Sequence, residues 1–337
     1  MYKQILKPLL FNFSPEEAHG LAMKGANLLT SLPFGNTILR SMAGIKEAQE
    51  STHFGLKFKN KIGLAAGFDK DGNYIKALHQ LGFGHIEVGT VTPRPQSGNP
   101  KPRLFRLKED KALINRMGFN NLGVHNLAEN IRQLSTGRPI IGGNIGKNKD
   151  TSNEDAWKDY VYCFKNLHEE VDYFTINLSS PNTPGLRALQ EKEPLIKIIS
   201  EVQNENNKLP APKPILLKIS PDNEISVYDD IISVAEECQL TGLIATNTTI
   251  DRIGLNTSET MLNVIGAGGL SGQPLTGKSL DTVKYIRKNM PASMTLIGVG
   301  GISNKEQADN MLAAGADLIQ LYTSFIYEGP GVVGKII

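Results

Sequence analysis

Short apolar runs alternate with longer stretches of helical periodicity from about residue 61 to the end of the chain. The runs are rich in Val, Ile, Leu, Phe and Thr, and in the stretches between them apolar positions recur every three or four residues. The pattern predicts eight strands: Ile62–Ala66, His85–Val91, Pro139–Ile145, Tyr173–Leu178, Ile215–Ile219, Gly242–Asn247, Thr295–Val299 and Asp317–Tyr322. The helices predicted between them are Asn73–Leu81, Leu122–Leu134, Asn153–Glu170, Glu193–Asn206, Ile225–Gln239, Lys278–Lys288 and Lys305–Ala314.

Strands that alternate with helices indicate an α/β protein with a parallel sheet, because two parallel neighbours need a long crossover between them. Eight such units close most simply into a (β/α)8 barrel, the TIM barrel. An open, doubly wound sheet gives the same pattern and stays an alternative, since the pattern alone does not show closure.

The first 45 residues do not join this repeat. Ser14 is followed by Pro15 and then by Glu17, a capping box with proline at the first helical position, which predicts a helix over about 15–32. An earlier apolar stripe at helical spacing consists of Tyr2, Ile5, Leu6, Leu9, Leu10 and Phe13. We therefore predict two units, an N-terminal helical extension over 1–45 and the barrel over 46–337.

The charge balance is close to neutral, with 36 Lys and Arg residues against 34 Asp and Glu and a formal net charge of +2. Such a small excess provides no broad basic field, so a nucleic-acid partner is not expected. Hydrophobic residues make up 40% of the chain and charged residues 21%, which suits a compact globular protein.

The two cysteines, Cys163 and Cys238, lie in separate predicted helices. Neither a disulfide framework nor a thiolate metal site is expected, and a reducing, cytoplasmic compartment follows. No window approaches the roughly 18 uninterrupted apolar residues of a transmembrane helix. Lys7 and Pro8 interrupt the N-terminal apolar stretch too early for a signal peptide, so we expect the mature chain to begin near Met1.

Polar residues stand at the carboxyl ends of the predicted strands, where barrels of this class place their reacting groups. They are mostly amides, hydroxyls and glycines, with two lysines and almost no carboxylate: Gly67, Lys70, Thr90, Asn144, Asn177, Ser180, Lys218, Thr246, Asn247, Thr248, Gly300, Gly301, Tyr322 and Thr323. A glycosidase pair is excluded, because Asp69 stands alone and Glu87 lies within its strand. The six histidines form no ligand cluster, which disfavours metal hydrolysis.

Three local signals point to a ligand, and each also has a plainer explanation. The glycines at 298–301 suit a phosphate held on backbone N–H groups, or only a tight turn. Lys218 lies in an apolar run, so it either acts at a ligand site or is paired with a buried carboxylate. Lys70 either acts at the site or is only an exposed charge on a loop. The loop Asn177–Arg187 has the turn residues of an ordered loop over a ligand, or of an ordinary long connection.

Longer motifs resemble those of dihydroorotate dehydrogenase and run through essentially the whole chain. They are AAGFDKDG at 65–72, EVGTVTPRPQ at 87–96, PRLFRL at 102–107, INRMGFNN at 114–121, NIGKNK at 144–149, INLSSPNTPGLR at 176–187, ATNTT at 245–249, GGLSG at 268–272 and IGVGGI at 297–302. The chain is more similar to the quinone-dependent class 2, because Ser180 stands where class 1 has a cysteine and because a helical extension precedes the barrel.

The resemblance implies an FMN-containing barrel that oxidises dihydroorotate to orotate in pyrimidine (UMP) synthesis and passes the electrons to a quinone. Ser180 would be the catalytic base. Implied FMN contacts are Ala66, Gly67, Phe68, Asp69, Lys70, Thr90, Asn144, Asn177, Lys218, Thr246, Gly272, Gly301, Tyr322 and Thr323. Implied dihydroorotate contacts are Lys70, Asn115, Arg116, Met117, Gly118, Phe119, Asn177, Asn182, Asn247 and Thr248. His19 and Arg106 match positions at the quinone site, and no metal is implied.

The resemblance also implies that the N-terminal extension is a membrane-facing entrance for the quinone. Lys3 and Lys7 flank its first apolar stripe and can meet anionic headgroups. We therefore expect a peripheral protein on the cytoplasmic side of the cell membrane.

Two other classes of function stay open at this point. One is a Schiff-base aldolase or lyase on the same barrel, with Lys218 as nucleophile. The other is a membrane-surface binding protein without catalysis, which the full set of polar strand ends disfavours. A yellow colour of the purified protein would distinguish a flavoprotein from both.

Overall fold

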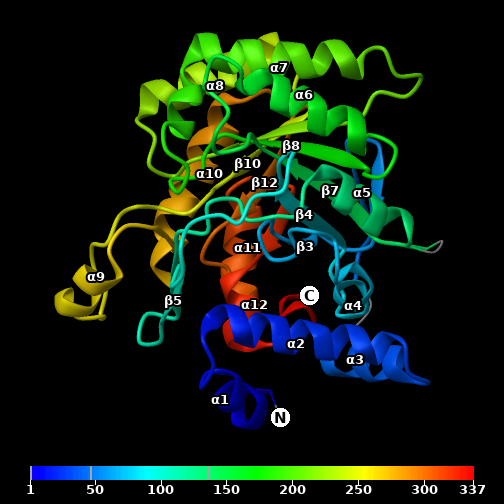
Figure 1. Ribbon diagram of the computed structural model, residues 1–337, viewed down its shortest axis with the longest axis vertical. Coiled ribbons are helices and arrows are strands. Elements are labelled where there is room, and N and C mark those ends of the chain that lie inside the picture. Colours follow the sequence, from blue (N-terminus) through cyan, green and yellow to red (C-terminus); the bar gives the residue numbers. More distant parts are fainter. Residues whose placement is uncertain (1, 46–47, 135–136) are drawn as a thin grey trace.

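The centre of the computed structural model, which describes residues 2–45, 48–134 and 137–337, is a closed barrel of parallel strands (Figure 1). The strands follow one another around the barrel in chain order: β3 (Ile62–Leu64), β4 (His85–Val91), β7 (Ile140–Ile145), β8 (Tyr173–Asn177), β9 (Ile215–Ile219), β10 (Gly242–Ala245), β12 (Thr295–Val299) and β13 (Leu318–Leu321). The ring closes where β13 pairs with β3, with Ile319 opposite Ile62. The predicted strands and barrel are confirmed, and the open-sheet alternative is wrong.

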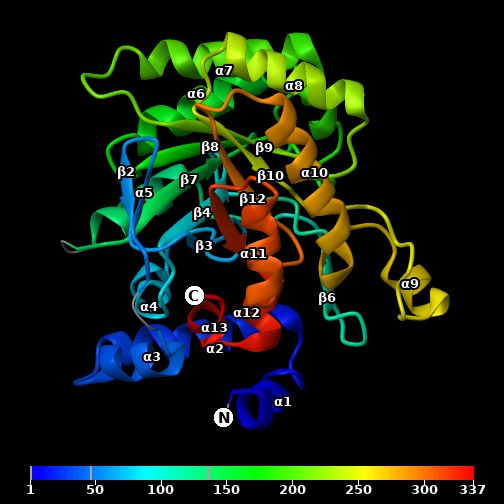
Figure 2. The same cartoon turned by 180° about the vertical axis from the view of Figure 1, so that it is seen from behind.

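Helices surround the barrel, and Figure 2 shows α10 and α11 next to each other on its outside. The outer helices are α4 (Ile75–Gln80), α5 (Val124–Arg132), α6 (Ala156–Leu167), α7 (Lys192–Asn206), α8 (Ile225–Glu237), α10 (Thr276–Asn289) and α11 (Lys305–Ala313). All the helices predicted between strands are confirmed, with ends that differ by at most three residues. The chain ends with α12 (Thr323–Glu328) and α13 (Val332–Ile336).

Alternate residues of the barrel strands point inward and outward. Outward residues such as Ile86 and Leu217 join the large apolar cluster between the strands and the helices. Near the amino ends of the strands the inward residues are also apolar, and Tyr173 and Leu216 belong to a second cluster. Toward the carboxyl ends of the strands the inward residues become polar, so they can line a binding site.

Two small sheets, neither of them predicted, flank the barrel. The hairpin of β1 (Ser51–His53) and β2 (Leu56–Phe58) closes the amino end, where the ring of Phe58 lies 5.4 Å from that of His85. Strands β5 (Leu104–Leu107), β6 (Ala112–Asn115) and β11 (Gly269–Gly272) form an antiparallel sheet beside the carboxyl end. Helix α9 (Glu259–Ile265) projects from the body next to this sheet (Figure 1).

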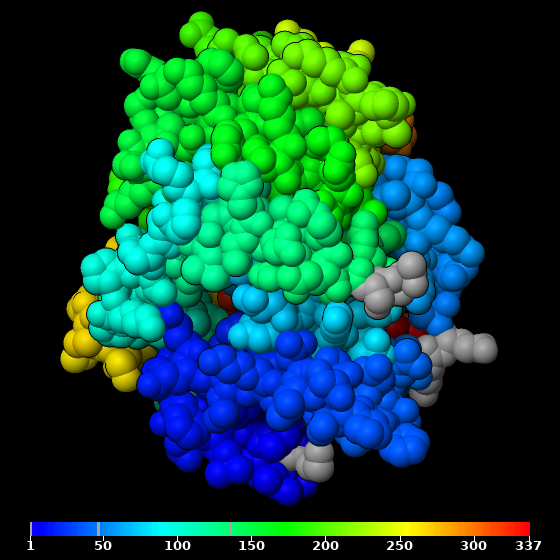
Figure 3. All heavy atoms as spheres, turned by 45° about the vertical axis from the view of Figure 1, so that its right-hand side comes forward, coloured from blue at the N-terminus to red at the C-terminus, as the bar shows by residue number. Residues whose placement is uncertain are grey.

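The N-terminal cap, residues 2–43, consists of η1 (Tyr2–Leu6), α1 (Lys7–Leu10), α2 (Pro15–Thr30) and α3 (Gly35–Ala43). Figure 3 shows it as a continuous layer under the barrel. The predicted capping box is confirmed, since the side chain of Ser14 accepts from the N–H of Glu17 and that of Glu17 accepts from the N–H of Ser14.

The division into two units at 45 and 46 stays a prediction, because Lys46 lies outside the described residues, as does Met1. Within the described ranges no helix combines the length and the hydrophobicity needed to span a membrane.

A salt bridge ties the cap to the barrel. The guanidinium of Arg103 contacts both carboxylate oxygens of Glu16, at 3.0 and 3.1 Å, and also donates to the carbonyls of Ser97 and Asn99. The side chain of Arg103 is only 8% exposed and that of Glu16 22%, so water screens the pair weakly. This contact therefore fixes α2 over the mouth of the barrel.

We predict that Glu16→Gln lowers the free energy of unfolding by about 2 kcal/mol, because a hydrogen-bonded charge is lost beside a buried guanidinium. Asp150→Asn is the control, since Asp150 pairs with Arg94 where both side chains are well exposed and a loss of under about 1 kcal/mol is expected. Urea unfolding of the two variants measures the difference. Equal effects would show that the buried pair does not anchor the cap.

Candidate active site

A polar cavity opens at the carboxyl ends of the barrel strands, with an empty space of ≈ 1210 Å³ that is partly open to solvent. We call it the polar cavity. Most residues singled out from the sequence line it: Ala66, Gly67, Lys70, Thr90, Asn115, Met117, Gly118, Phe119, Asn177, Ser180, Asn182, Lys218, Thr246, Asn247, Thr248, Gly272, Gly301, Tyr322 and Thr323. The closed barrel thus gathers side chains from all along the sequence at one mouth.

Amide and hydroxyl groups in the polar cavity hold one another in fixed orientations. Asn177 donates to the hydroxyl of Thr90 at 2.8 Å, and Thr90 donates to the amide oxygen of Asn144 at 2.5 Å. Farther along the wall, Asn182 donates to Asn115 at 3.0 Å. Such a wall can offer both donors and acceptors to a flat ligand that carries amide groups.

Three lysines line the polar cavity: the exposed Lys111 and the more deeply placed Lys70 and Lys218. Burial lowers the pKa of Lys70 to about 8, with the nearby Arg103 guanidinium acting in the same direction. Burial also lowers the pKa of Lys218, and the charge of Glu87 opposes that effect. Among the described lining residues the one carboxylate is Glu328, which pairs with Lys3 at 2.5 Å. The polar cavity therefore suits an anionic ligand.

Two glycines line one wall of the polar cavity where neighbouring protein atoms are packed too closely for a side chain. A Cβ at Gly272 would lie 2.5 Å from the carbonyl oxygen of Lys111, and one at Gly301 would lie 2.2 Å from the hydroxyl oxygen of Thr276. Both glycines also have positive φ angles, of 99° and 72°, which side chains disfavour. Backbone N–H groups can approach an anion closely at such a wall.

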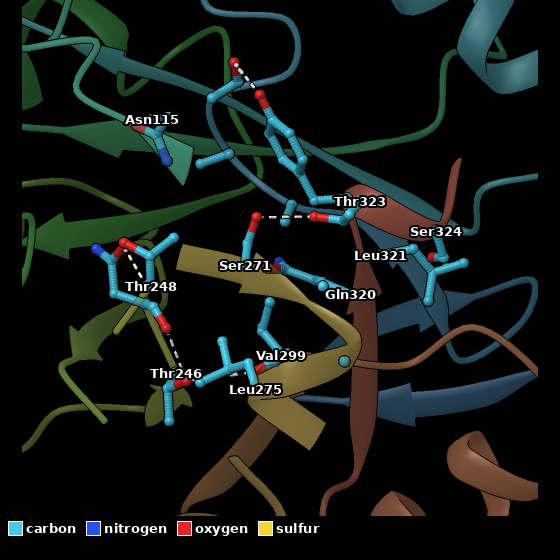
Figure 4. A pocket seen from close by; sticks show the side chains of 18 of the residues that line it. Asn115, Thr246, Thr248, Ser271, Leu275, Val299, Gln320, Leu321, Thr323 and Ser324 are labelled. Carbon is cyan, nitrogen blue, oxygen red and sulfur yellow. Dashed lines mark hydrogen bonds between the residues drawn. The ribbon is translucent and has the colours of Figure 1, made fainter. Parts of the chain in front are cut away.

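Further lining residues were missed from the sequence: Lys111, Ser271, Gln273, Leu275, Ile302, Ser303, Gln320, Leu321, Ser324, Tyr327 and Glu328. Figure 4 shows Ser271 and Thr323 facing each other, joined by a hydrogen bond of 2.8 Å. Within the described ranges, the Gln320 amide oxygen and the Ser324 hydroxyl are buried without a hydrogen-bond partner. Ser271 was missed because β11 was not predicted, and Gln320 because it lies inside a strand.

Four residues predicted at the FMN or substrate site have side chains elsewhere. Phe68 and Asp69 line a second cavity: the ring of Phe68 lies 4.6 Å from that of His19, and the Asp69 carboxylate accepts from the N–H groups of Asn73 and Tyr74 at the start of α4. Their side chains are therefore structural groups beside the polar cavity.

Arg116 and Asn144 are the other two. The guanidinium of Arg116 donates to the carbonyls of Pro102 and Ala267 at 3.0 and 3.2 Å, contacts that hold the loop before β11, and it does not line the polar cavity. The Asn144 amide lies behind Thr90 and donates to Glu87 at 2.7 Å. It orients the lining residue without lining the polar cavity itself.

The second cavity, which we call the apolar cavity, lies between the N-terminal cap and the barrel and encloses ≈ 2090 Å³ of partly open empty space. Its lining is mostly aliphatic and aromatic, and it includes the predicted quinone-site residues His19 and Arg106. The two cavities share four lining residues: Gly67, Lys70, Met117 and Tyr322.

Polar side chains are a minority of the lining of the apolar cavity. Burial, with Lys70 nearby, lowers the pKa of His19 to about 4, so its ring is neutral at physiological pH. Arg106 lies over the ring of Phe11, with its guanidinium carbon 4.4 Å from the ring centroid, and donates to the carbonyl of Phe13. Its Nε is buried with no hydrogen-bond partner within the described ranges. The apolar cavity can therefore hold a lipophilic ligand with one or two polar atoms.

Metal chemistry finds no support in the described residues, among which no three His, Cys, Asp or Glu side chains gather as ligands. Both cysteines are free, Cys163 buried and Cys238 partly so.

The comparisons with known proteins agree with this architecture. The sequence model of the family "Dihydroorotate dehydrogenase" matches residues 48–337. The chain is 50% identical over 337 residues to the "Dihydroorotate dehydrogenase (quinone)" of Christiangramia forsetii, covering 100% of this chain and 97% of that protein. It is 44% identical to the protein of the same name from Flavobacterium lutescens, covering 99% and 94%.

A solved structure is similar over almost the whole fold. The Eimeria tenella DHODH in complex with ferulenol matches with a TM-score of 0.86 and 37% sequence identity, covering 96% of this chain and 89% of that one. The ligand-free structure of the same protein gives a TM-score of 0.85. The chain therefore belongs to the dihydroorotate dehydrogenase family, among its quinone-dependent, class 2 members.

Proposed function

We propose that this chain oxidises dihydroorotate to orotate on a bound FMN in the polar cavity and passes the two electrons to a quinone in the apolar cavity. The observation that carries the proposal is the wall shared by the two cavities, where Gly67, Lys70, Met117 and Tyr322 line both. A flavin against this wall can meet a polar substrate on one side and a lipophilic acceptor on the other.

The residues of the polar cavity fit an FMN. The backbone at Gly272 and Gly301 lines the polar cavity and can contact its phosphate, and the unpartnered hydroxyl of Ser324 can bond a polar group of the cofactor. Lys218 would stabilise the negative charge that builds on the flavin ring on reduction. When bound, the flavin accepts a hydride from the substrate and later gives electrons to the quinone.

The amide residues of the polar cavity fit dihydroorotate. Asn115, Asn177, Asn182 and Asn247 can donate to and accept from its carboxylate and ring amides. Lys70, at the shared wall, provides a positive charge for the carboxylate. Substrate specificity would thus come from fixed hydrogen-bond geometry, since the groups that bind the ring also bind one another.

Ser180 is the residue that we assign as the base. Forming the double bond removes a proton from one carbon and a hydride from its neighbour, so a base must face the flavin across the substrate. Ser180 lines the polar cavity, and its oxygen accepts from the N–H of Asn182 at 3.3 Å. A serine hydroxyl is a weak base, so its own proton must move on to another acceptor.

We also propose that the protein is attached peripherally to the cytoplasmic face of the cell membrane, and the exposed apolar side chains of the cap support the attachment itself. Its large apolar side chains are exposed to an unusual degree for a protein surface: Ile5 55%, Leu9 57%, Phe13 48%, Leu21 56%, Leu28 63%, Leu32 50%, Phe34 82% and Ile38 47%. Short amphipathic helices of this kind lie in the membrane interface with the apolar face buried. A quinone could then pass from the lipid into the apolar cavity without entering water.

We predict that Ser180→Ala binds FMN normally but that dihydroorotate reduces its flavin about 10²- to 10⁴-fold more slowly, because a positioned base is removed. Ser233→Ala is the control, since Ser233 is exposed on α8, away from the polar cavity. Rapid-mixing absorbance of the flavin measures the rate. Bleaching of Ser180→Ala at the control rate would contradict the assignment, and colourless wild-type protein would contradict the flavin itself.

For the membrane surface we predict that the double variant Leu28→Glu, Phe34→Glu binds liposomes about 100-fold more weakly, since each buried apolar side chain contributes about 1.5 kcal/mol or more. Turnover with a long-chain quinone should fall, while reduction of the flavin by dihydroorotate should not change. Ile225→Glu, at an exposed apolar position on α8, is the matched control. Unchanged liposome binding by the double variant would contradict the membrane role of the cap.

A further inference from the structure

A carboxylate is buried inside the barrel, directly behind the residues that line the polar cavity. Glu87 is on β4, is 0% exposed and points inward between β7 and β13. Its two oxygens accept three hydrogen bonds, from Asn144 at 2.7 Å, Gln320 at 2.9 Å and Tyr173 at 3.3 Å. Each of these described partners is a hydrogen-bond donor, so both carboxylate oxygens are occupied as acceptors.

The charge of Glu87 needs a counter-charge, because an isolated ion in a barrel interior is costly. None of its described hydrogen-bond partners is cationic. Among the described strand residues that point into the barrel, Lys218 on β9 is the one other charged group, and it is 6% exposed. The negative charge of Glu87 raises the pKa of Lys218 against the larger, lowering effect of burial.

The other titratable groups in the interior are neutral. Burial raises the pKa of Tyr173, on β8, well above its usual value, and burial lowers that of His85, on β4, to about 3. The apolar cluster inside the barrel includes Ala65, just after β3, Ile244 on β10 and Val299 on β12, while β7 and β13 contribute the neutral amides Asn144 and Gln320. Glu87 and Lys218 therefore balance each other across the barrel.

We propose that Glu87 is a positioning residue of the flavin site: its buried carboxylate is the counter-charge that keeps Lys218 an ammonium group at the polar cavity. The inference rests on the proposed function, since it takes Lys218 to face a bound flavin. Through Asn144, the same carboxylate also fixes Thr90 and Asn177, which line the polar cavity. Glu87 acts on the reaction only through these neighbours.

The substitution Glu87→Gln tests the charge with little change of shape. The new amide oxygen can accept from Asn144, and its N–H₂ can donate to Gln320, whose own amide oxygen has no partner among the described residues. The exchange needs rotation of the Gln320 amide and of the Tyr173 hydroxyl, because both donate to the same Glu87 oxygen. A folded variant without the interior negative charge is therefore expected.

The measurement is the midpoint potential of the bound flavin as a function of pH. If Lys218 loses its proton in the accessible range, flavin reduction takes up an additional proton there and the slope of potential against pH becomes steeper. In Glu87→Gln this change of slope should move to lower pH than in the wild type, because the ammonium has lost its counter-charge. A profile with the same shape as that of the wild type would overturn the proposal.

Lys218→Arg is the matched control, because a guanidinium stays charged at every accessible pH. In that background Glu87→Gln should leave the shape of the profile unchanged. An equal change of shape with arginine at 218 would show that the effect does not pass through Lys218, and would overturn the proposal.

A second measurement does not need a bound flavin. Removing one member of a buried charge pair is far more destabilising than replacing both. The thermal midpoints of Glu87→Gln, Lys218→Met and the double variant form a double-mutant cycle. The midpoint of the double variant should fall by less than the sum of the two single decreases. Additive losses would overturn the pairing. A wild-type protein that binds no flavin would contradict the proposed function, and this cycle would still decide the role of Glu87.

Discussion

The closure of the barrel through the pairing of β13 with β3 is the constraint on which the site depends. Parallel strands that close into a ring place all eight carboxyl ends at one mouth, so Lys70, Ser180 and Lys218, from three distant parts of the chain, line one cavity. Closure also creates a buried interior, in which a polar group without a hydrogen-bond partner is costly. The hydrogen-bonded wall of the polar cavity is a consequence of that cost.

The second constraint is the position of the cap. It covers the mouth without filling it and leaves an apolar cavity whose wall is shared with the polar one through Lys70 and Tyr322. The buried pair of Glu16 and Arg103 joins the two parts at this place. A polar and an apolar compartment that share one thin wall let two reactants of opposite solubility use one cofactor without mixing.

The carboxylate of Glu87 shows that burial determines which role a residue has in the folded protein. On the sequence, Glu87 could be set aside as a catalytic acid, because it lies within a strand and has no second carboxylate. In the folded chain the same position makes it the acceptor of three hydrogen bonds and the counter-charge of a lysine at the polar cavity. Its influence comes from the low dielectric of the interior, where charges interact over longer distances than in water.

The sequence by itself determined the features that depend on neighbours along the chain. Hydrophobic periodicity located every barrel strand and outer helix, and Ser14 and Glu17 located the start of α2. Strand ends and long motifs located many, but not all, of the residues that line the polar cavity. The tertiary structure decided what depends on distant pairing. The short strands β5, β6 and β11 have no periodicity of their own, and Arg116 binds carbonyl groups of a loop about 150 residues away. Thr90 lines the polar cavity, whereas Asn144 lies behind it and accepts its hydrogen bond. Their different roles depend on the pairing of β4 with β7, which the sequence of either strand alone does not specify.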